Sequence, residues 1–353
     1  MEAFGKKIKE ITAALFMAIV LAAFLCACAG TGNSDAGIKE EENDSADKVV
    51  VISPHPVDFM KPLLNEFESQ TGITVEIIRS GTSEAVKRIS GNEAIDVLWG
   101  GSVLTVSSYD DSFAEYKTVN YGDFSEEFRD MPEGVTCFTD VPSVLIVNTD
   151  LCGDISIEGY EDLLDPRLKG RIAFASPEKS SSSFEHLVNM LYAMGGGNPE
   201  NGWDYAQKLA DQIGGNLLEG SSQVYNGVAS GKFIVGLTFE EAAITQMKAG
   251  RHVKIVYMEE GVVFTPDGLY ISKKAKNPEN ARKFVDFMTA KDTQRYISAD
   301  LGRRSVLKDV EESPLVTPKE DINVITVDSD TVTSCKDEWT LRFAALCGED
   351  GHE

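Results

Sequence analysis

Apolar runs alternate with amphipathic stretches in the first half of this chain, and this alternation limits the folds open to it. Residues 48–52 (KVVVI) are β-branched, and residues 60–67 then place large apolar side chains on one helix face. An alternating strand at 73–77, a short helix ending near residue 90 and the run 95–99 (IDVLW) follow. Strands separated by helices form parallel sheets with right-handed crossovers, whose carboxyl-end loops converge on a crevice where ligands bind.

The second half repeats this order of elements. Residues 142–148 (PSVLIVN) are too apolar for a loop and predict a strand that crosses between two sheets, and residues 261–271 predict the return crossing. The remaining pattern predicts strands at 171–175, 233–238 and 253–257, separated by helices at 184–191, 203–213 and 240–249.

The chain therefore predicts an α/β fold of two lobes. A discontinuous first lobe is expected at 48–141 and 262–353, and a continuous second lobe at 142–261. Each lobe is expected to hold a mostly parallel sheet flanked by helices, with the crossing strands as a hinge.

The N-terminus has the pattern of an export signal. Residues 1–10 carry three lysines, and the uncharged run 11–27 is at or below the roughly 18 residues that a spanning helix needs. Its end resembles the lipobox of bacterial lipoproteins, with Leu25 three residues before Cys28 and a small residue directly before it. This resemblance implies removal of residues 1–27 and lipidation of Cys28, although the cysteines of a cleaved signal could also be incidental.

Residues 28–47 hold small, polar and acidic side chains and almost nothing to bury, so we expect a flexible tether to the membrane. The formal net charge of −24 makes nucleic acid and anionic lipid poor partners. Four further cysteines have no zinc-site spacing and predict no metal; free thiols and disulfides both remain open for Cys137, Cys152, Cys335 and Cys347.

The loops at the predicted strand ends are rich in serine, threonine and glycine. Hydroxyls and unpaired amides at a helix start favour anions, because these amides lack intrahelical partners and the helix dipole is positive there. Ordinary helix capping is the alternative for each loop taken alone, and a core position is the alternative for the tryptophan. The candidate ligand-binding residues are Ser53, His55, Gly81, Thr82, Ser83, Trp99, Gly100, Gly101, Ser181, Ser182, Ser183, Ser221 and Ser222.

Charged candidates lie near the same loops. Glu240 and Glu241 follow a predicted strand; they either complement a helix dipole or accept hydrogen bonds from a hydroxyl or amine of the ligand. His55 is either a switchable charge near physiological pH or a neutral histidine packed between prolines. Arg303 and Arg304 are expected to be solvated surface charges rather than an anion clamp.

Enzyme signatures are missing from the sequence. The GxSxG, HExxH and GxGxxG motifs do not occur, and residues 227–233 (GVASGKF) lack the spacing of a phosphate loop. We therefore expect neither an enzyme nor a cofactor, while a tethered hydrolase of phosphate esters or glycosides remains an alternative.

Several segments resemble extracellular solute-binding proteins of ABC importers, in the branch of ferric-iron, phosphonate and hexose-phosphate binders. They include VVVISPHPVDFMKPLLNEFESQTGITVEI, DVLWGGS, PSVLIVNTD, SSSSFEHLVNMLYAMG, SGKFIVGLTFEEAA and NPENARKFVDFM. The resemblance implies a type II periplasmic-binding-protein fold that closes on its ligand. It also implies an extracytoplasmic, lipid-anchored monomer that delivers the ligand to an ABC permease, or a signalling adaptor that presents it to a sensor.

Within this branch, iron binders place neighbouring tyrosines after the strand that corresponds to 233–238. This chain has Thr238-Phe239-Glu240-Glu241 there and no Tyr-Tyr pair, so ferric ion is the second choice of ligand. Its SPHP and serine loops resemble the hexose-phosphate and phosphonate members. That resemblance implies a small phosphorylated anion, a sugar phosphate before an aminoalkylphosphonate. Its phosphoryl end would face Ser53, Thr82, Ser83 and Ser181 to Ser183, and its other end Glu240.

Overall fold

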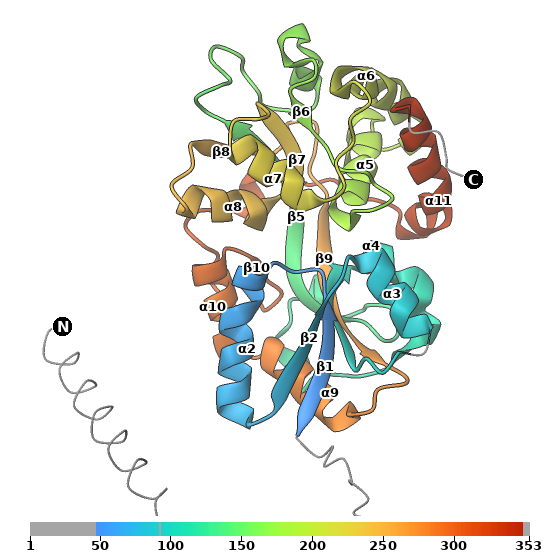
Figure 1. Cartoon of the computed structure of the whole chain (residues 1–353), viewed down its shortest axis with the longest axis vertical. Helices are drawn as coiled ribbons and strands as arrows, with labels where there is room; N and C mark the ends of the chain where they lie inside the picture. The colour runs from blue at the N-terminus through green and yellow to red at the C-terminus, as the bar shows by residue number, and fades with distance from the viewer. Residues whose placement is uncertain (1–46, 92, 349–353) are drawn as a thin grey trace, which may run out of the picture. The chain divides into compact units, whose positions relative to one another are not determined.

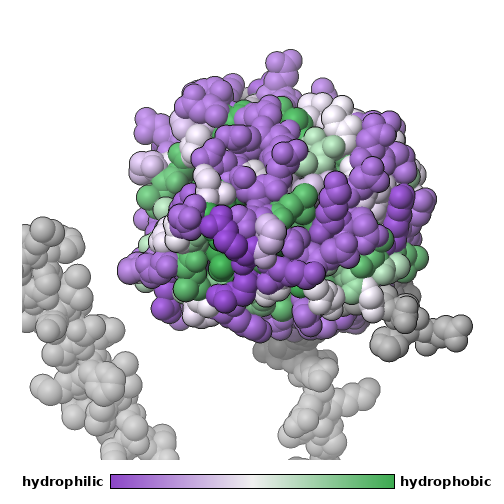
Figure 2. Space-filling model, turned by 90° about the horizontal axis from the view of Figure 1, so that it is seen from above, coloured by the Kyte–Doolittle hydropathy of each residue, from purple (hydrophilic) through white to green (hydrophobic). Residues whose placement is uncertain are grey.

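The computed structural model describes residues 47–91 and 93–348 (Figure 1). The predicted signal segment, Cys28 and the tether up to residue 46 lie outside this part of the chain. No helix within the described residues is long and apolar enough to cross a membrane. Figure 2 shows one end of this region, on which hydrophilic side chains dominate and apolar ones form separate spots.

The first lobe begins with the predicted β-α-β-α-β order. Strand β1 (Lys48–Ser53) pairs in parallel with β2 (Thr74–Arg79) on one side and β3 (Val97–Ser102) on the other. Helices α2 (Val57–Thr71) and α3 (Thr82–Ser90) connect these strands. The predicted α/β alternation is therefore confirmed here.

Further short elements complete the first lobe. They are α4 (Val103–Val106), β4 (Phe113–Ala114), α9 (Pro278–Met288), α10 (Lys291–Tyr296) and β10 (Arg304–Ser305). The apolar face of α9 packs with α2 and β1, and α10 continues into a π-helical turn at Ile297–Leu301.

Two long strands join the lobes, as predicted. Strand β5 (Thr136–Asn148) runs antiparallel to β9 (Phe264–Ser272), and the two lie side by side between the lobes in Figure 1. The main path of the described sheet has the order β2-β1-β3-β9-β5-β7-β6, in which β7 is Val235–Phe239 and β6 is Ile172–Ala173. The predicted lobe boundary after residue 141 falls inside β5.

The second lobe combines four helices with three short strands and the end of β5. The helices are α5 (Ser181–Met194), α6 (Trp203–Ile213), α7 (Ser221–Ala229) and α8 (Glu240–Lys248). The strands are β6 (Ile172–Ala173), β7 (Val235–Phe239) and β8 (Val253–Val256). Only β6 and β7 pair in parallel, whereas β7 and β8 pair antiparallel to β5. The expectation of a mostly parallel sheet is corrected for this lobe, because the crossing strand is its central strand.

The last helix, α11 (Ser329–Leu346), packs on the second lobe, although residues 262–353 were predicted to belong to the first. The ring centroids of Trp339 and Phe343 lie 6.4 Å from Tyr192 and 5.5 Å from Phe174. All four side chains are buried in the core of the second lobe. Burial of these large aromatic rings, rather than chain order, determines where the helix packs.

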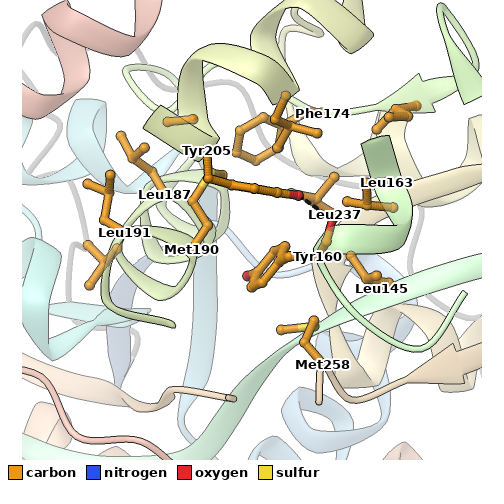
Figure 3. Packing of buried hydrophobic residues seen from close by; sticks show 14 of the residues in the cluster. Leu145, Tyr160, Leu163, Phe174, Leu187, Met190, Leu191, Tyr205, Leu237 and Met258 are labelled. Atoms are coloured by element: carbon orange, nitrogen blue, oxygen red, sulfur yellow. Dashed lines mark hydrogen bonds between the residues drawn. The ribbon is translucent and has the colours of Figure 1, made fainter. Parts of the chain in front are cut away.

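A buried histidine makes three polar contacts in the core of the second lobe. Its Nε2 lies 2.7 Å from the Thr238 carbonyl oxygen and 3.0 Å from that of Val144, and its Nδ1 lies 3.1 Å from the Tyr160 hydroxyl. This residue, His186, is neutral, because burial lowers its pKa to about 4. Figure 3 shows Tyr160 within the surrounding cluster, where the Tyr205 hydroxyl donates a hydrogen bond to its carbonyl.

Candidate ligand-binding site

A cavity of about 520 Å³ lies between the lobes, and the predicted loops of both lobes line it. From the first lobe come Ser53, Pro54, His55, Pro56, Arg79, Ser80, Gly81, Thr82, Gly101, Asp267 and Arg303. From the crossing strand and the second lobe come Val141, Lys179, Ser180, Ser181, Ser182, Glu185, Glu219, Gly220, Ser221, Ser222, Tyr225 and Phe239. The lobes approach closely here, with Thr82 Oγ1 at 3.4 Å from Ser181 Oγ.

Three helices begin at this cavity. Helices α3 and α7 start directly after Gly81 and Gly220, which have no side chain to cap them, and α5 starts after Ser180, whose hydroxyl makes no capping hydrogen bond. The first amides of each helix therefore lack an acceptor from the preceding side chain. Because each amino end also carries a partial positive charge, their convergence favours an anion.

Two cationic side chains line the same region. Arg79 ends β2, is exposed, and pairs with no carboxylate among the described residues. The second, Lys179, is paired, with its Nζ 2.8 Å from Glu219 Oε1. Arg79 thus supplies a guanidinium that a ligand anion can bind without displacing a protein carboxylate.

A buried arginine also contributes to the lining. Arg303 is 5% exposed; its Nη1 is 2.5 Å from Asp267 Oδ2, and its Nη2 is 3.2 Å from Glu241 Oε2. Arg304 is 2% exposed and pairs with Glu240 at 2.7 Å. The expectation that both arginines are solvated is wrong. Strand β10 pairs with β5, and both side chains are buried beside this pairing.

His55 is buried against this arginine. Its Nδ1 lies 3.4 Å from Arg303 Nη2, and since a guanidinium only donates, Nδ1 accepts and the proton sits on Nε2. Burial, and then the nearby Arg303, lower the pKa of His55 well below 6.5. The histidine is therefore neutral, which supports the second of the two alternatives given for it, a neutral packed histidine.

Both glutamates predicted to face the ligand point elsewhere. Glu240 is 2% exposed, binds Arg304, and accepts a hydrogen bond from the Tyr257 hydroxyl at 2.6 Å. Glu241 is occupied by Arg303, and neither glutamate lines the cavity. Placing Glu240 at the ligand's polar end is thus wrong, because the arginines draw both carboxylates away from the cavity.

Other predicted residues support the site without lining it. Trp99 is fully buried, and its ring centroid lies 5.8 Å from that of Phe138. Trp99 is therefore a core residue, which was the alternative given for it. Gly100 has φ 101°, and a Cβ there would lie 2.5 Å from His55 Nε2, so glycine makes room for the imidazole. Ser83 and Ser183 do not line the cavity, and Ser183 is 1% exposed.

The structure adds lining residues that the sequence analysis missed. Arg79 directly precedes the predicted Ser80-Gly81-Thr82-Ser83 turn, and Glu185 lies one turn after the predicted serines. Asp267 is the single acidic residue of the crossing strand β9, and the sequence could have indicated it on that ground. Nothing in the sequence around Tyr225 indicated that it lines the cavity.

A second cavity of about 490 Å³ lies in the first lobe alone. It is lined by aromatic and charged side chains of residues 115–137 and by Arg282. None of the predicted binding residues reaches it, so the interlobe cavity is the candidate site.

Comparison with known proteins agrees with this arrangement. Residues 63–324 match the model of the bacterial extracellular solute-binding protein family. The chain belongs to this family. As a member, it is an extracytoplasmic solute-binding receptor of the kind that serves ABC importers; receptors of this kind bind small ligands and interact with permeases.

Individual relatives differ in what their names say they bind. The chain resembles the structure of the periplasmic binding protein AfuA from Actinobacillus pleuropneumoniae with fructose-6-phosphate bound, with a TM-score of 0.78, 20% identity, and coverage of 86% of this chain and 99% of AfuA. A structure described as a two-component system protein mediating signal transduction has a TM-score of 0.68 and 30% identity, covering 79% and 94%. Iron uptake protein A1 of Synechocystis sp. is 24% identical over 263 residues, covering 70% of this chain and 72% of that protein.

Proposed function

We propose that this protein captures a small phosphorylated organic anion, a sugar phosphate before an aminoalkylphosphonate, for delivery to a permease. One observation carries the proposal: the amino ends of α3, α5 and α7, taken from both lobes, meet Arg79 at one cavity. A phosphoryl group offers several acceptor oxygens, and these donors match them.

The energies are adequate for such a ligand. A hydrogen bond to a charged group contributes roughly 1.5–3 kcal/mol, and micromolar affinity needs about 8 kcal/mol. Four or five donors therefore suffice. The cavity of about 520 Å³ also falls within the usual size range of small-molecule sites.

Other lining residues suit the organic portion of the ligand. Asp267 and Glu185 offer oxygen atoms to ligand hydroxyls, and Tyr225 and Phe239 offer ring surfaces for carbon atoms. A sugar phosphate carries both kinds of group. The fructose-6-phosphate named for AfuA supports this choice.

Ferric ion is the competing ligand, and the iron uptake relative is the observation in its favour. Two features rank ferric ion second: the stretch Thr238-Phe239-Glu240-Glu241 has none of the neighbouring tyrosines of the iron binders, and both of its glutamates are paired with arginines. Asp267 is moreover engaged by Arg303.

A role in signalling is the second candidate function, in which the closed receptor presents its ligand state to a membrane sensor. The structure of a two-component system protein, at 30% identity, favours it. Both functions use the same cavity and differ in the membrane partner. Crosslinking in membranes would separate them, by capture of a permease or of a sensor kinase.

We also propose that the mature protein is a monomer tethered through a lipid on Cys28, for which the lipobox-like LCAC sequence is the support. Mass spectrometry of the membrane fraction should find the acylated cysteine at a new N-terminus. Cys28→Ala should release the protein from the membrane fraction, and continued membrane retention would contradict the anchor.

A thermal-shift panel tests the ligand class. The probes are fructose 6-phosphate, glucose 6-phosphate, 2-aminoethylphosphonate, inorganic phosphate and ferric citrate. A ligand at 100 times its dissociation constant stabilises the folded state by about 2.7 kcal/mol. We expect the sugar phosphates to raise Tm most; stabilisation by ferric citrate alone would overturn the proposal, and turnover of a bound ester would indicate a hydrolase.

A further inference from the structure

An acidic side chain faces the cavity with no cation paired to it. Glu185 lies on α5, three and four residues after Ser182 and Ser181, so it shares their helix face. It is 7% exposed and lines the cavity, and it forms no ion pair among the described residues.

The groups around Glu185 leave its carboxyl without a counter-ion. Ser102 on β3 hydrogen-bonds to it, Asp267 on β9 repels its negative charge, and Arg303 and Lys336 attract that charge from further away. Arg303 is already shared by Asp267 and Glu241, while Lys336 on α11 donates to the Thr105 carbonyl at 3.2 Å.

A buried carboxylate without a counter-ion is costly, and such a group takes up a proton instead. Burial, opposed by the Ser102 hydrogen bond, raises the pKa of Glu185 to about 8. The side chain is then an uncharged acid at neutral pH. In that form it has one hydroxyl donor and retains acceptor oxygens.

We propose that Glu185 is a specificity-determining residue that contacts the ligand as an uncharged carboxylic acid and selects ligands whose organic portion carries hydroxyl groups over those that carry an ammonium group. A hydroxyl both accepts from and donates to such an acid. An ammonium group only donates and needs a free carboxylate, but Asp267 is held by Arg303. The inference rests on the proposed function and names the preferred class within it.

Calorimetric titration across pH 7 to 9.5 tests this, with fructose 6-phosphate and 2-aminoethylphosphonate as probes. The second pKa of a phosphate monoester is about 6, so the sugar phosphate stays a dianion throughout. We expect the dissociation constant of fructose 6-phosphate to rise once the pH exceeds about 8. The increase should approach tenfold for each further pH unit. The affinity for 2-aminoethylphosphonate, weaker at pH 7, should improve over the same interval.

Glu185→Gln keeps an uncharged donor and acceptor at this position. It should bind fructose 6-phosphate within about threefold of wild type at pH 7 and show no pH dependence near 8. Glu178→Gln, an exposed position on the preceding loop that does not line the cavity, should keep the wild-type profile.

The outcomes separate the two proposals. If wild type binds the sugar phosphate and Glu185→Gln shares its pH profile, the role of Glu185 is wrong and the proposed function stands. If neither probe binds wild type at any pH, both are overturned. The opposite pH slopes of the two probes can be measured on wild type alone, so parallel slopes overturn the role of Glu185 even where the variant fails to fold.

Discussion

At the scale of single residues, ligand binding depends on which charged side chains at the cavity are already paired with other side chains of the protein. Arg303 and Arg79 are both guanidinium groups at the cavity, yet Arg303 is bound by two carboxylates and Arg79 by none among the described residues. Sequence reasoning identified the serine and glycine loops of the site. It could not assign these charges, because each pairing joins residues from distant parts of the chain.

Removing the guanidinium at residue 79 should therefore weaken ligand binding without unfolding the protein. We expect Arg79→Gln to raise the dissociation constant of fructose 6-phosphate about tenfold or more, since a charge-assisted hydrogen bond contributes roughly 1.5–3 kcal/mol. Tm without ligand should stay unchanged, because the side chain is exposed. Arg251→Gln, exposed and outside the cavity lining, is the matched control; equal affinity in both variants would contradict the role of Arg79.

The neutral His186 should make the fold sensitive to acid. Its pKa falls from 6.5 to about 4 on folding, so its contribution is complete above pH 6.5 and is lost as the pH falls toward 4. The loss amounts to about 3 kcal/mol. Urea unfolding across pH 4 to 7 should show a shallower slope of stability with pH for His186→Gln than for wild type or the exposed variant His252→Gln. Identical slopes would show that His186 titrates normally.

At the scale of elements, the sequence predicted the strands and helices that carry continuous apolar patterns. The patterns at 48–52, 95–99 and 142–148 correspond to β1, β3 and the end of β5. Two features were not readable: β10 is only two residues long, and α11 packs on the second lobe. Both depend on contacts with distant segments rather than on local periodicity.

The buried pair of Arg304 with Glu240 should hold β10 against the start of α8. Arg304→Met should destabilise the fold by about 3–5 kcal/mol, because it leaves a buried carboxylate without its partner. Adding Glu240→Gln should recover part of this loss. The exposed pair of Arg295 with Asp292 provides the control, and Arg295→Met should cost less than about 1 kcal/mol in chemical denaturation. A small effect of Arg304→Met would mean that water solvates Glu240.

At the scale of the whole molecule, the cavity exists because two lobes meet over a pair of crossing strands. Each lobe contributes helix amino ends, and neither lobe lines the cavity alone. The contact of Thr82 with Ser181 joins the lobes beside the cavity. Such a hinged arrangement couples ligand binding to closure.

Ligand should therefore shift the population toward the closed form. Small-angle scattering of the mature chain should show a smaller radius of gyration on addition of saturating fructose 6-phosphate. Arg79→Gln should require a higher ligand concentration for the same change, because it weakens binding rather than the hinge. An unchanged radius with ligand demonstrably bound would mean that the lobes are already closed without it.

The sequence by itself determined the α/β class, the two-lobed order, the crossing strands and the small-residue loops that surround the site, because these features depend on local periodicity and turn chemistry. Only the tertiary structure decided which charges remain for the ligand. It buried Arg303, Arg304, Glu240 and Glu241 in mutual pairs, kept His55 neutral, and left Arg79 and Glu185 at the cavity. The physical reason is that pairing and desolvation depend on neighbours brought together by folding, and the order of residues does not contain those distances.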